Sequence, residues 1–289
     1  MADKKNRPRR SLAWINVLVK DKLQQAIESN VDSIVLDLED TLPVNQKEIG
    51  RAETVRALME EDFQGKERVV RINALDTQWA EADLLAVLPA LPDAIRLPKC
   101  ETVEYVLRLD SIISEFEHAH NLVRNSIGII LMIETPLGII NCVDMAKCSD
   151  RIYAIGLGME DLTTSLRVAR SYELNSLNLL YARQKLVIAG RAAGVQVLDS
   201  SVLLDDSEFI YQDSVNSKQF GYDGRSVVNL KHVDAVNRAY RPSDKEIEWA
   251  NKIIDIYDHR KETGEEPYYQ GLFVDIPVVT KARQILETL

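Results

Sequence analysis

The sequence has few cysteines, and it has no long apolar run. Its three cysteines, Cys100, Cys142 and Cys148, are an odd number without CxxC spacing, which argues against a framework of disulfides. We therefore expect reduced thiols in a cytoplasmic protein. No run of about 18 apolar residues is present, so the sequence predicts no transmembrane helix.

Positive charge is also scarce, because 35 Lys and Arg residues stand against 45 Asp and Glu residues and the formal net charge is −10. Nucleic acids and membrane surfaces attract positively charged proteins, so a general role at either is disfavoured. The first ten residues, MADKKNRPRR, hold five of the basic residues and lack the apolar stretch of a secretory signal. We expect residues 1–10 to form a flexible basic arm.

Short apolar runs alternate with longer helical patterns along most of the 289 residues. The predicted strands are 11–15, 33–39, 68–73, 94–98, 127–134, 152–157, 195–200 and 225–230, and the clearest helices are 21–29, 46–60, 79–88, 103–119 and 174–193. Several strands are continuously apolar, as parallel strands covered on both faces are. Eight such units predict an α/β fold, a (β/α)8 TIM barrel over residues 11–240.

An open doubly wound sheet is the alternative fold. It is less favoured because GLGMED, residues 156–161, lacks the third glycine of a dinucleotide-binding fingerprint. The pattern changes after residue 240, where a long polar helix precedes a hinge and the segment YYQGLFVDIPVVTKARQIL. We expect residues 241–289 to form an appended C-terminal helix and lid.

Polar residues collect where the predicted strands end. They are Asp37, Glu39, Asp40, Arg71, Asn73, Lys99, Glu134, Glu160 and Asp161. In barrels of this kind, functional residues lie at the carboxyl ends of the strands and in the loops that follow. A single acidic residue there is better explained as a helix N-cap or a surface charge.

Glu134 and Asp161 are the strongest candidates for a metal site because they follow neighbouring predicted strands. Two facing carboxylates repel each other unless a proton or a cation lies between them. Oxygen ligands with open positions suit Mg²⁺, whereas the four histidines form no cluster that would suggest zinc. Thr135 and Pro136 fit the N-cap and first position of the next helix.

Arg71 and Arg10 are candidates for binding a substrate carboxylate, since a guanidinium can hold a carboxylate through two hydrogen bonds. The alternative for Arg71 is a structural ion pair with Glu39 or Asp40. Lys99 raises the possibility of a Schiff-base aldolase, although its charged neighbours favour a solvated or paired lysine.

Eight motifs, taken in order, resemble one family. They are RRSL (9–12), DSIVLDLEDTL (32–42), RVVRIN (68–73), AIRLPK (94–99), IETPLGIIN (133–141), IGLGMEDL (155–162), FGYDGRSVV (220–228) and GLFVDIPVVTKAR (271–283). Together they resemble the citrate lyase beta subunit group of the HpcH/HpaI aldolase superfamily. The resemblance covers nearly the whole chain.

The resemblance implies a barrel that binds Mg²⁺ through Glu134 and Asp161 and grips the substrate carboxylate with Arg71. It implies reversible carbon–carbon cleavage of citryl-CoA, malyl-CoA or citramalyl-CoA in a homotrimer or hexamer. An Asp on the lid, matched by Asp275, reaches the neighbouring subunit in several members. Apart from the resemblance, we expect Glu39 and Asp40 to hold arginines and waters around the site, and the alternative is that Asp37, Glu39 and Asp40 form only a charged rim.

The sequence departs from the family pattern in two loops that lie near coenzyme A. Asn16 and Val17 replace a Pro-Gly turn after the first strand, and residues 228–230, Val-Asn-Leu, replace Ile-His-Pro after the eighth. Losing a turn glycine hinders close approach of the backbone to a ligand. Lys20, Lys22 and Arg225 are still candidates for phosphate contacts. A lyase of free hydroxy or oxo acids and a non-catalytic subunit that needs partner chains are therefore alternatives.

Overall fold

The chain forms two compact units, Met1–Asn237 and Arg238–Leu289. The computed structural model describes residues 5, 7–174, 176–264 and 266–287. Within these ranges no helix is long and apolar enough to cross a membrane. The three cysteines are free thiols, with Cys100 and Cys142 buried and Cys148 half-buried, as the sequence predicts.

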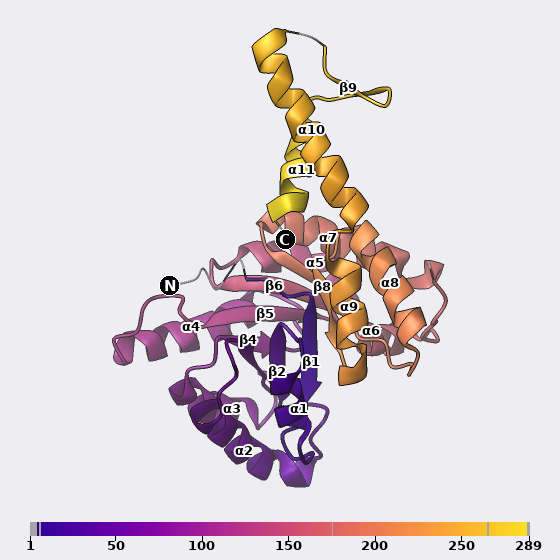
Figure 1. The fold of residues 1–289 in the computed structure, drawn as a ribbon. Coiled ribbons are helices and arrows are strands. Elements are labelled where there is room, and N and C mark those ends of the chain that lie inside the picture. The colour runs from indigo at the N-terminus through magenta and orange to yellow at the C-terminus, as the bar shows by residue number, and fades with distance from the viewer. Residues whose placement is uncertain (1–4, 6, 175, 265, 288–289) are drawn as a thin grey trace. The chain divides into compact units, whose positions relative to one another are not determined.

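The first unit is built around a closed barrel of parallel strands in chain order, β1 to β8 (Figure 1). The strands are β1 Ser11–Ile15, β2 Ser33–Asp37, β3 Glu67–Arg71, β4 Ala94–Leu97, β5 Gly128–Ile133, β6 Ile152–Leu157, β7 Gln196–Asp199 and β8 Gly224–Val227. β1 pairs with both β2 and β8, which closes the sheet on itself. The predicted (β/α)8 barrel is confirmed, and the open sheet is wrong.

Helices follow the strands around the outside of the barrel. They are α1 Lys22–Glu28, α2 Lys47–Glu60, α3 Ala80–Val87, α4 Val103–Ala119, α5 Pro136–Lys147, α6 Met159–Leu166, α7 Leu180–Ala193, α8 Ser207–Phe220 and α9 Val233–Tyr240. The helix predicted from residue 174 begins only at residue 180. Ser176 donates its hydroxyl hydrogen to Asn178 at 2.6 Å, and such local side-chain bonds compete with helix formation.

Apolar side chains fill the barrel interior, so it is a packed core and not a pore. Leu12, Val35, Val69, Ile130 and Leu198, each fully buried, belong to one such cluster. The parallel register pairs Asp37, the last residue of β2, with Arg71, the last residue of β3. Arg71 in turn pairs with Arg96 of β4. Asp37, Arg71 and Arg96 therefore stand in one row near the carboxyl ends of their strands.

The second unit has a small core of its own. It contains α10 Asp244–Thr263, the two-stranded ribbon β9 Tyr268–Tyr269 and β10 Leu272–Phe273, and α11 Ile276–Glu287. Ser243 and Glu246 form a capping box at the start of α10, which satisfies its first free N–H groups. Ala250, Ile253, Val274, Val279 and Ala282 pack together between the helices.

Candidate active site at the carboxyl end of the barrel

Five of the nine polar residues predicted at the strand ends line one cavity, whereas Asp37, Glu39, Asn73 and Lys99 are not among its lining residues. The volume of the cavity is about 190 Å³, and its lining includes Arg71, Glu134 and Asp161 together with Trp14 and Lys22. Asp40, Glu160, Ser200, Ser201 and Ser226 also line it. The cavity lies at the carboxyl ends of the strands, where catalytic residues of such barrels gather.

Glu134 follows β5 and is only 1% exposed. Its Oε1 accepts a hydrogen bond from the Lys99 backbone N–H at 2.7 Å, and Lys99 has a positive φ of 52°. A Cβ on Gly158 would lie 2.4 Å from Glu134 Oε2, so only glycine fits beside the carboxylate. Thr135 caps α5 by accepting from Gly138 N–H at 3.0 Å, as predicted.

The Glu134 carboxylate is shielded from solvent and lies near other charged groups. Burial raises its pKa above the ordinary value, and the Asp161 carboxylate raises it further, while the Lys99 N–H and Arg71 oppose the shift. Asp161 lies in the first turn of α6 and is half-buried. The two carboxylates thus share one cavity and repel each other, the arrangement that a cation relieves.

These residues fit a magnesium ion. The two candidate ligands offer only carboxylate oxygens, and Mg²⁺ prefers few protein ligands with its other positions taken by water or substrate. Among the described residues no group of three or more His, Cys, Asp and Glu side chains is placed to hold a metal. A two-carboxylate site agrees with that finding.

Arg71 is the best connected cation of the cavity. Its Nε and Nη2 donate to the two oxygens of Asp37 at 2.6 and 2.8 Å, and its Nη1 lies 2.6 Å from Glu39 and 3.0 Å from Asp40. The ion pairs that the sequence offered as an alternative are therefore present. Although burial opposes it, Arg71 holds the pKa of Asp37 below its ordinary value.

Glu39 and Lys99 form a second pair beside Arg71, 3.2 Å apart. Burial raises the pKa of Glu39 to about 7, even though Arg71 favours the charged form. Burial lowers the pKa of Lys99, but the Glu39 carboxylate outweighs it and the net shift is upward. A Schiff-base lysine needs a lowered pKa, so this geometry favours the paired lysine.

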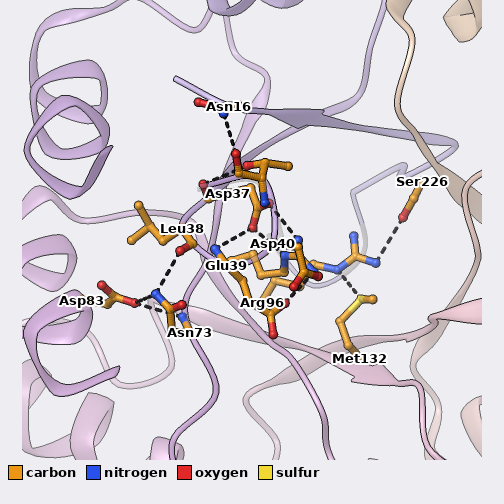
Figure 2. Close-up of polar contacts among 12 residues, drawn as sticks. Asn16, Asp37, Leu38, Glu39, Asp40, Asn73, Asp83, Arg96, Met132 and Ser226 are labelled. Carbon is orange, nitrogen blue, oxygen red and sulfur yellow. Dashed lines mark hydrogen bonds and ion pairs between the residues drawn. The ribbon is translucent and has the colours of Figure 1, made fainter. Parts of the chain in front are cut away.

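Lys47 holds the backbone of the loop that carries Glu39 and Asp40. The sequence did not predict this role. The buried Lys47 Nζ donates to the carbonyl oxygens of Leu38 and Glu39 at 2.7 and 2.6 Å and to Asn73 Oδ1 at 2.7 Å. Asn73 also donates to Leu38 O, as Figure 2 shows. An ammonium with three acceptors locks the backbone behind the acidic residues.

Arg10 does not join this group. It lies just before β1, at the amino end of the barrel, where its Nε and Nη2 donate to Asp32 at 2.9 and 2.7 Å. Residues before a parallel strand and residues after it lie at opposite ends of the barrel, which separates Arg10 from the cavity. Its guanidinium is a partner of Asp32.

Asp275 belongs to the second unit. Its Oδ1 accepts from Val278 N–H at 3.1 Å, at the start of α11. This is the bond of a helix N-cap, so the described contacts give Asp275 a structural role.

The loops that depart from the family pattern are tied down by asparagines. Asn16 donates to Thr41 O at 2.7 Å and accepts from Leu18 N–H at 2.9 Å. Asn229 caps the short helix Leu230–His232. Arg225 is fully buried and pairs with Asp213 at 2.9 Å, so it is not available to a phosphate, whereas Lys22 lines the cavity.

Trp14, Met132 and Ser226 are among the lining residues that were not predicted from the sequence. Each lies in a strand and contacts Arg96, which is fully buried. The sequence shows one signal for this arrangement, a charged residue inside the otherwise apolar run AIRL. It does not show that the Arg96 side chain points into the barrel.

Comparison with known proteins agrees with the fold and the motifs. The model of the family described as HpcH/HpaI aldolase/citrate lyase matches residues 10–230. The chain belongs to this family of carbon–carbon lyases.

Named relatives span almost the whole chain. Citrate lyase subunit beta of Escherichia coli (strain K12) is 32% identical over 289 residues, covering 99% of this chain and 95% of that protein. The subunit of the same name from Leuconostoc mesenteroides subsp. cremoris is 36% identical, covering 89% and 85%. Human mitochondrial citramalyl-CoA lyase is 28% identical, covering 96% and 84%.

Solved structures share the fold at lower identity. A citrate lyase from Burkholderia xenovorans LB400 aligns with a TM-score of 0.84 at 17% identity, covering 96% of this chain and 91% of that one. Protein CitE from Mycobacterium tuberculosis, in complex with magnesium, acetoacetate and coenzyme A, aligns with a TM-score of 0.79 at 23% identity, covering 98% of both.

Proposed function

We propose that the protein is a Mg²⁺-dependent lyase that cleaves or forms the carbon–carbon bond of a 2-hydroxy acid acyl-CoA thioester of the citryl-CoA, malyl-CoA or citramalyl-CoA class. The observation that carries the proposal is the convergence of Glu134, Asp161 and Arg71 on one cavity at the carboxyl end of the barrel. The names of the relatives agree with this reaction class.

The reaction needs three things from the protein. The substrate hydroxyl must lose its proton, the carbon–carbon bond must break with its electron pair moving to the carbon beside the thioester, and the resulting enolate must be stabilised and then protonated. The products are an acyl-CoA and a 2-oxo acid. A cavity that holds the carboxylate and the hydroxyl in fixed positions lowers the entropic part of the barrier.

The described residues have matching roles. Glu134 and Asp161 would hold the metal, and Arg71 would orient the substrate carboxylate while Asp37 fixes its guanidinium. Bound there, Mg²⁺ would act as a Lewis acid toward the substrate oxygens. Asp40 is the most exposed partner of Arg71, its side chain being 58% exposed, so it is the one that gives way to a substrate carboxylate.

Asp275 is proposed, from the family resemblance, to move a proton when the C-terminal segment of a neighbouring subunit closes over the site. A homotrimer or hexamer belongs to the same proposal. The Asp275→Asn variant should fold and bind Mg²⁺ normally yet lose turnover. Unchanged turnover would leave Asp275 as the N-cap of α11.

A lyase of free hydroxy or oxo acids is the second candidate. Two observations favour it: the Asn16 loop, which the family resemblance puts near coenzyme A, is held by a hydrogen bond to Thr41, and Arg225, a candidate phosphate contact, is buried and paired with Asp213. Lys22 in the cavity lining is the feature that still suits a phosphate or thioester ligand.

The decisive experiment incubates the purified protein with Mg²⁺ and citryl-CoA, malyl-CoA or citramalyl-CoA beside the free acids, and follows release of acyl-CoA and oxo acid. Cleavage of thioesters is expected, and cleavage of free acids alone would favour the second candidate. Oxo-acid binding without turnover would indicate a subunit that needs partner chains. Mg²⁺ binding that survives in Glu134→Ala, measured by calorimetry, would overturn the metal site.

A further inference from the structure

Arg96 differs from the other fully buried arginines. Four arginines have fully buried side chains in the described part of the chain: Arg9, Arg96, Arg151 and Arg225. The other three have a carboxylate partner within 3 Å, namely Glu67, Glu117 and Asp213 respectively. Among the described residues Arg96 has no ion pair with a carboxylate, and its Nη1 has no hydrogen-bond partner. A buried charge without a counter-charge is costly.

The Arg96 side chain crosses the barrel interior from β4 to β8. Its Nη2 donates to Ser226 Oγ at 3.1 Å and its Nε lies 2.8 Å from Met132 Sδ (Figure 2). Its guanidinium carbon is 4.5 Å from the ring centroid of Trp14. A Cβ on Gly156 would lie 3.1 Å from Nη2, so the glycine leaves room for the guanidinium.

The residues that hold Arg96 are also the floor of the cavity. Trp14, Met132 and Ser226 all line it, so the guanidinium is one side chain away from any ligand. Burial lowers the pKa of Arg96 to about 9, and the nearby Arg71 acts in the same direction. The group is therefore still charged at neutral pH, and its field favours an anion in the cavity.

Ser226 lies between Arg96 and the cavity and can donate a hydrogen bond to an anionic ligand. Its oxygen accepts from Arg96, and its hydroxyl hydrogen has no acceptor among the described residues, so the O–H is free to donate into the cavity. Ser200 is similar, because its Oγ accepts from Met159 N–H at 3.1 Å. Two hydroxyl groups, one of them in contact with the buried cation, thus lie along the β7 and β8 side of the cavity.

We propose that Ser226, backed by Arg96, forms a subsite for a second carboxylate, so that the enzyme prefers substrates whose 2-oxo acid product is a dicarboxylate. This inference rests on the proposed function and narrows its substrate class. Ser226 contacts the distal carboxylate, and Arg96 is a positioning residue that acts through the serine. Arg71 serves the other carboxylate, the one next to the reacting carbon.

The test compares binding of two acids by calorimetry in the presence of Mg²⁺. Freshly dissolved oxaloacetate and 2-oxobutyrate share the 2-oxo carboxylate and differ in the distal group, a carboxylate against a methyl. A hydrogen bond to a charged group contributes about 1.5–3 kcal/mol, so the wild type should bind oxaloacetate about 10-fold to 100-fold more tightly. Ser226→Ala should lose most of that ratio and bind 2-oxobutyrate as before.

Two arginine variants and one control complete the design. Arg96→Met keeps the volume and should abolish the preference, whereas Arg96→Lys should restore part of it. Ser33→Ala removes a hydroxyl that donates to Glu67 at the other end of the barrel, and it should leave both affinities unchanged. If Arg96→Met does not fold, Ser226→Ala decides alone.

Equal binding of the two acids by the wild type, or a Ser226→Ala variant that weakens both equally, would overturn the subsite and leave the proposed function standing. Failure of the wild type to bind either acid would overturn the proposed function, and the subsite with it.

Discussion

Both ends of the barrel contain buried arginines and carboxylates, but only one end balances them. At the amino end Arg9 and Glu67 have fully buried side chains and bind each other through Arg9 Nε and Nη2. Ser33 donates to Glu67 at 2.6 Å, and Arg9 donates to Gln196 at 2.7 Å. The charges of Arg9 and Glu67 thus face each other inside the protein, which is the arrangement of a structural ion pair.

The carboxyl end carries an excess of carboxylates around one cavity. Arg71 faces three acidic side chains at once, Asp37, Glu39 and Asp40. Burial raises the pKa of Glu39 and of Glu134, while Arg96 forms no ion pair with a carboxylate in the part of the chain that the structure describes. Neighbouring carboxylates without a cation, and a buried arginine without a carboxylate, are unfavourable in the unliganded protein. Binding of a cation and an anion at the cavity would stabilise both. The difference between the ends separates a structural network from a ligand site.

Glu67→Gln breaks the balanced end and should give the largest effect on stability. The variant removes the buried negative charge that accepts hydrogen bonds from Arg9 Nε and Nη2, and breaking a buried ion pair in this way costs about 3–5 kcal/mol. Urea unfolding of the metal-free protein measures it. Glu53→Gln is the control, because Glu53 and Arg56 form an exposed pair worth about 0–1 kcal/mol. Equal losses in the two variants would show that the amino end is not a structural network.

Glu39→Gln tests the unbalanced end through pH. The pKa of Glu39 is about 7 in the folded protein against an ordinary 4.5, so the folded state binds more protons than the unfolded state between these values. Stability must therefore fall as pH rises through this window. Relative to the wild type, the variant should gain about 1–3 kcal/mol between pH 5 and pH 8 in metal-free urea unfolding. If the free energies of unfolding of the variant and the wild type depend on pH in the same way, the pKa of Glu39 is not raised in the folded protein.

The sequence was sufficient to predict the barrel because continuously apolar runs mark parallel strands directly. The bounds predicted for β1 and β6 are the observed ones, and helix 103–119 matches α4. Glu134, Asp161 and Arg71 could be predicted to share a cavity because each follows or ends a strand, and all such ends lie on one rim. Strand direction alone was enough for this.

Side-chain direction and pairing could not be predicted in the same way. The sequence makes Arg10 a candidate for binding the substrate carboxylate. Arg10 precedes its strand, however, and the structure places it with Asp32 at the other end of the barrel. Arg96 stands inside a four-residue apolar strand, where a continuous run gives no alternation to show which side chains point inward. Its contact with Ser226 joins residues 130 positions apart, which only closure of the barrel specifies.

Asp40→Asn should have the smallest effect on stability and still separate the two ends. The Asp40 side chain is 58% exposed, and its pair with Arg71 spans 3.0 Å, so removing its charge should change the free energy of unfolding by less than about 0.5 kcal/mol. The same change relieves Arg71 of one competitor for a substrate carboxylate. Oxaloacetate affinity in the presence of Mg²⁺ should therefore rise, by about 2-fold to 5-fold for a gain of 0.4–1 kcal/mol.

Calorimetry and urea unfolding of the same Asp40→Asn preparation check both halves. The matched change at the balanced end is Asp32→Asn, which removes a carboxylate from Arg10 and should leave the oxo-acid affinity unchanged. A fall in affinity in Asp40→Asn would mean that Asp40 holds Arg71 in place. The acidic excess would then be a scaffold for the arginine, and the carboxyl end would resemble the amino end more closely than its mispaired charges suggest.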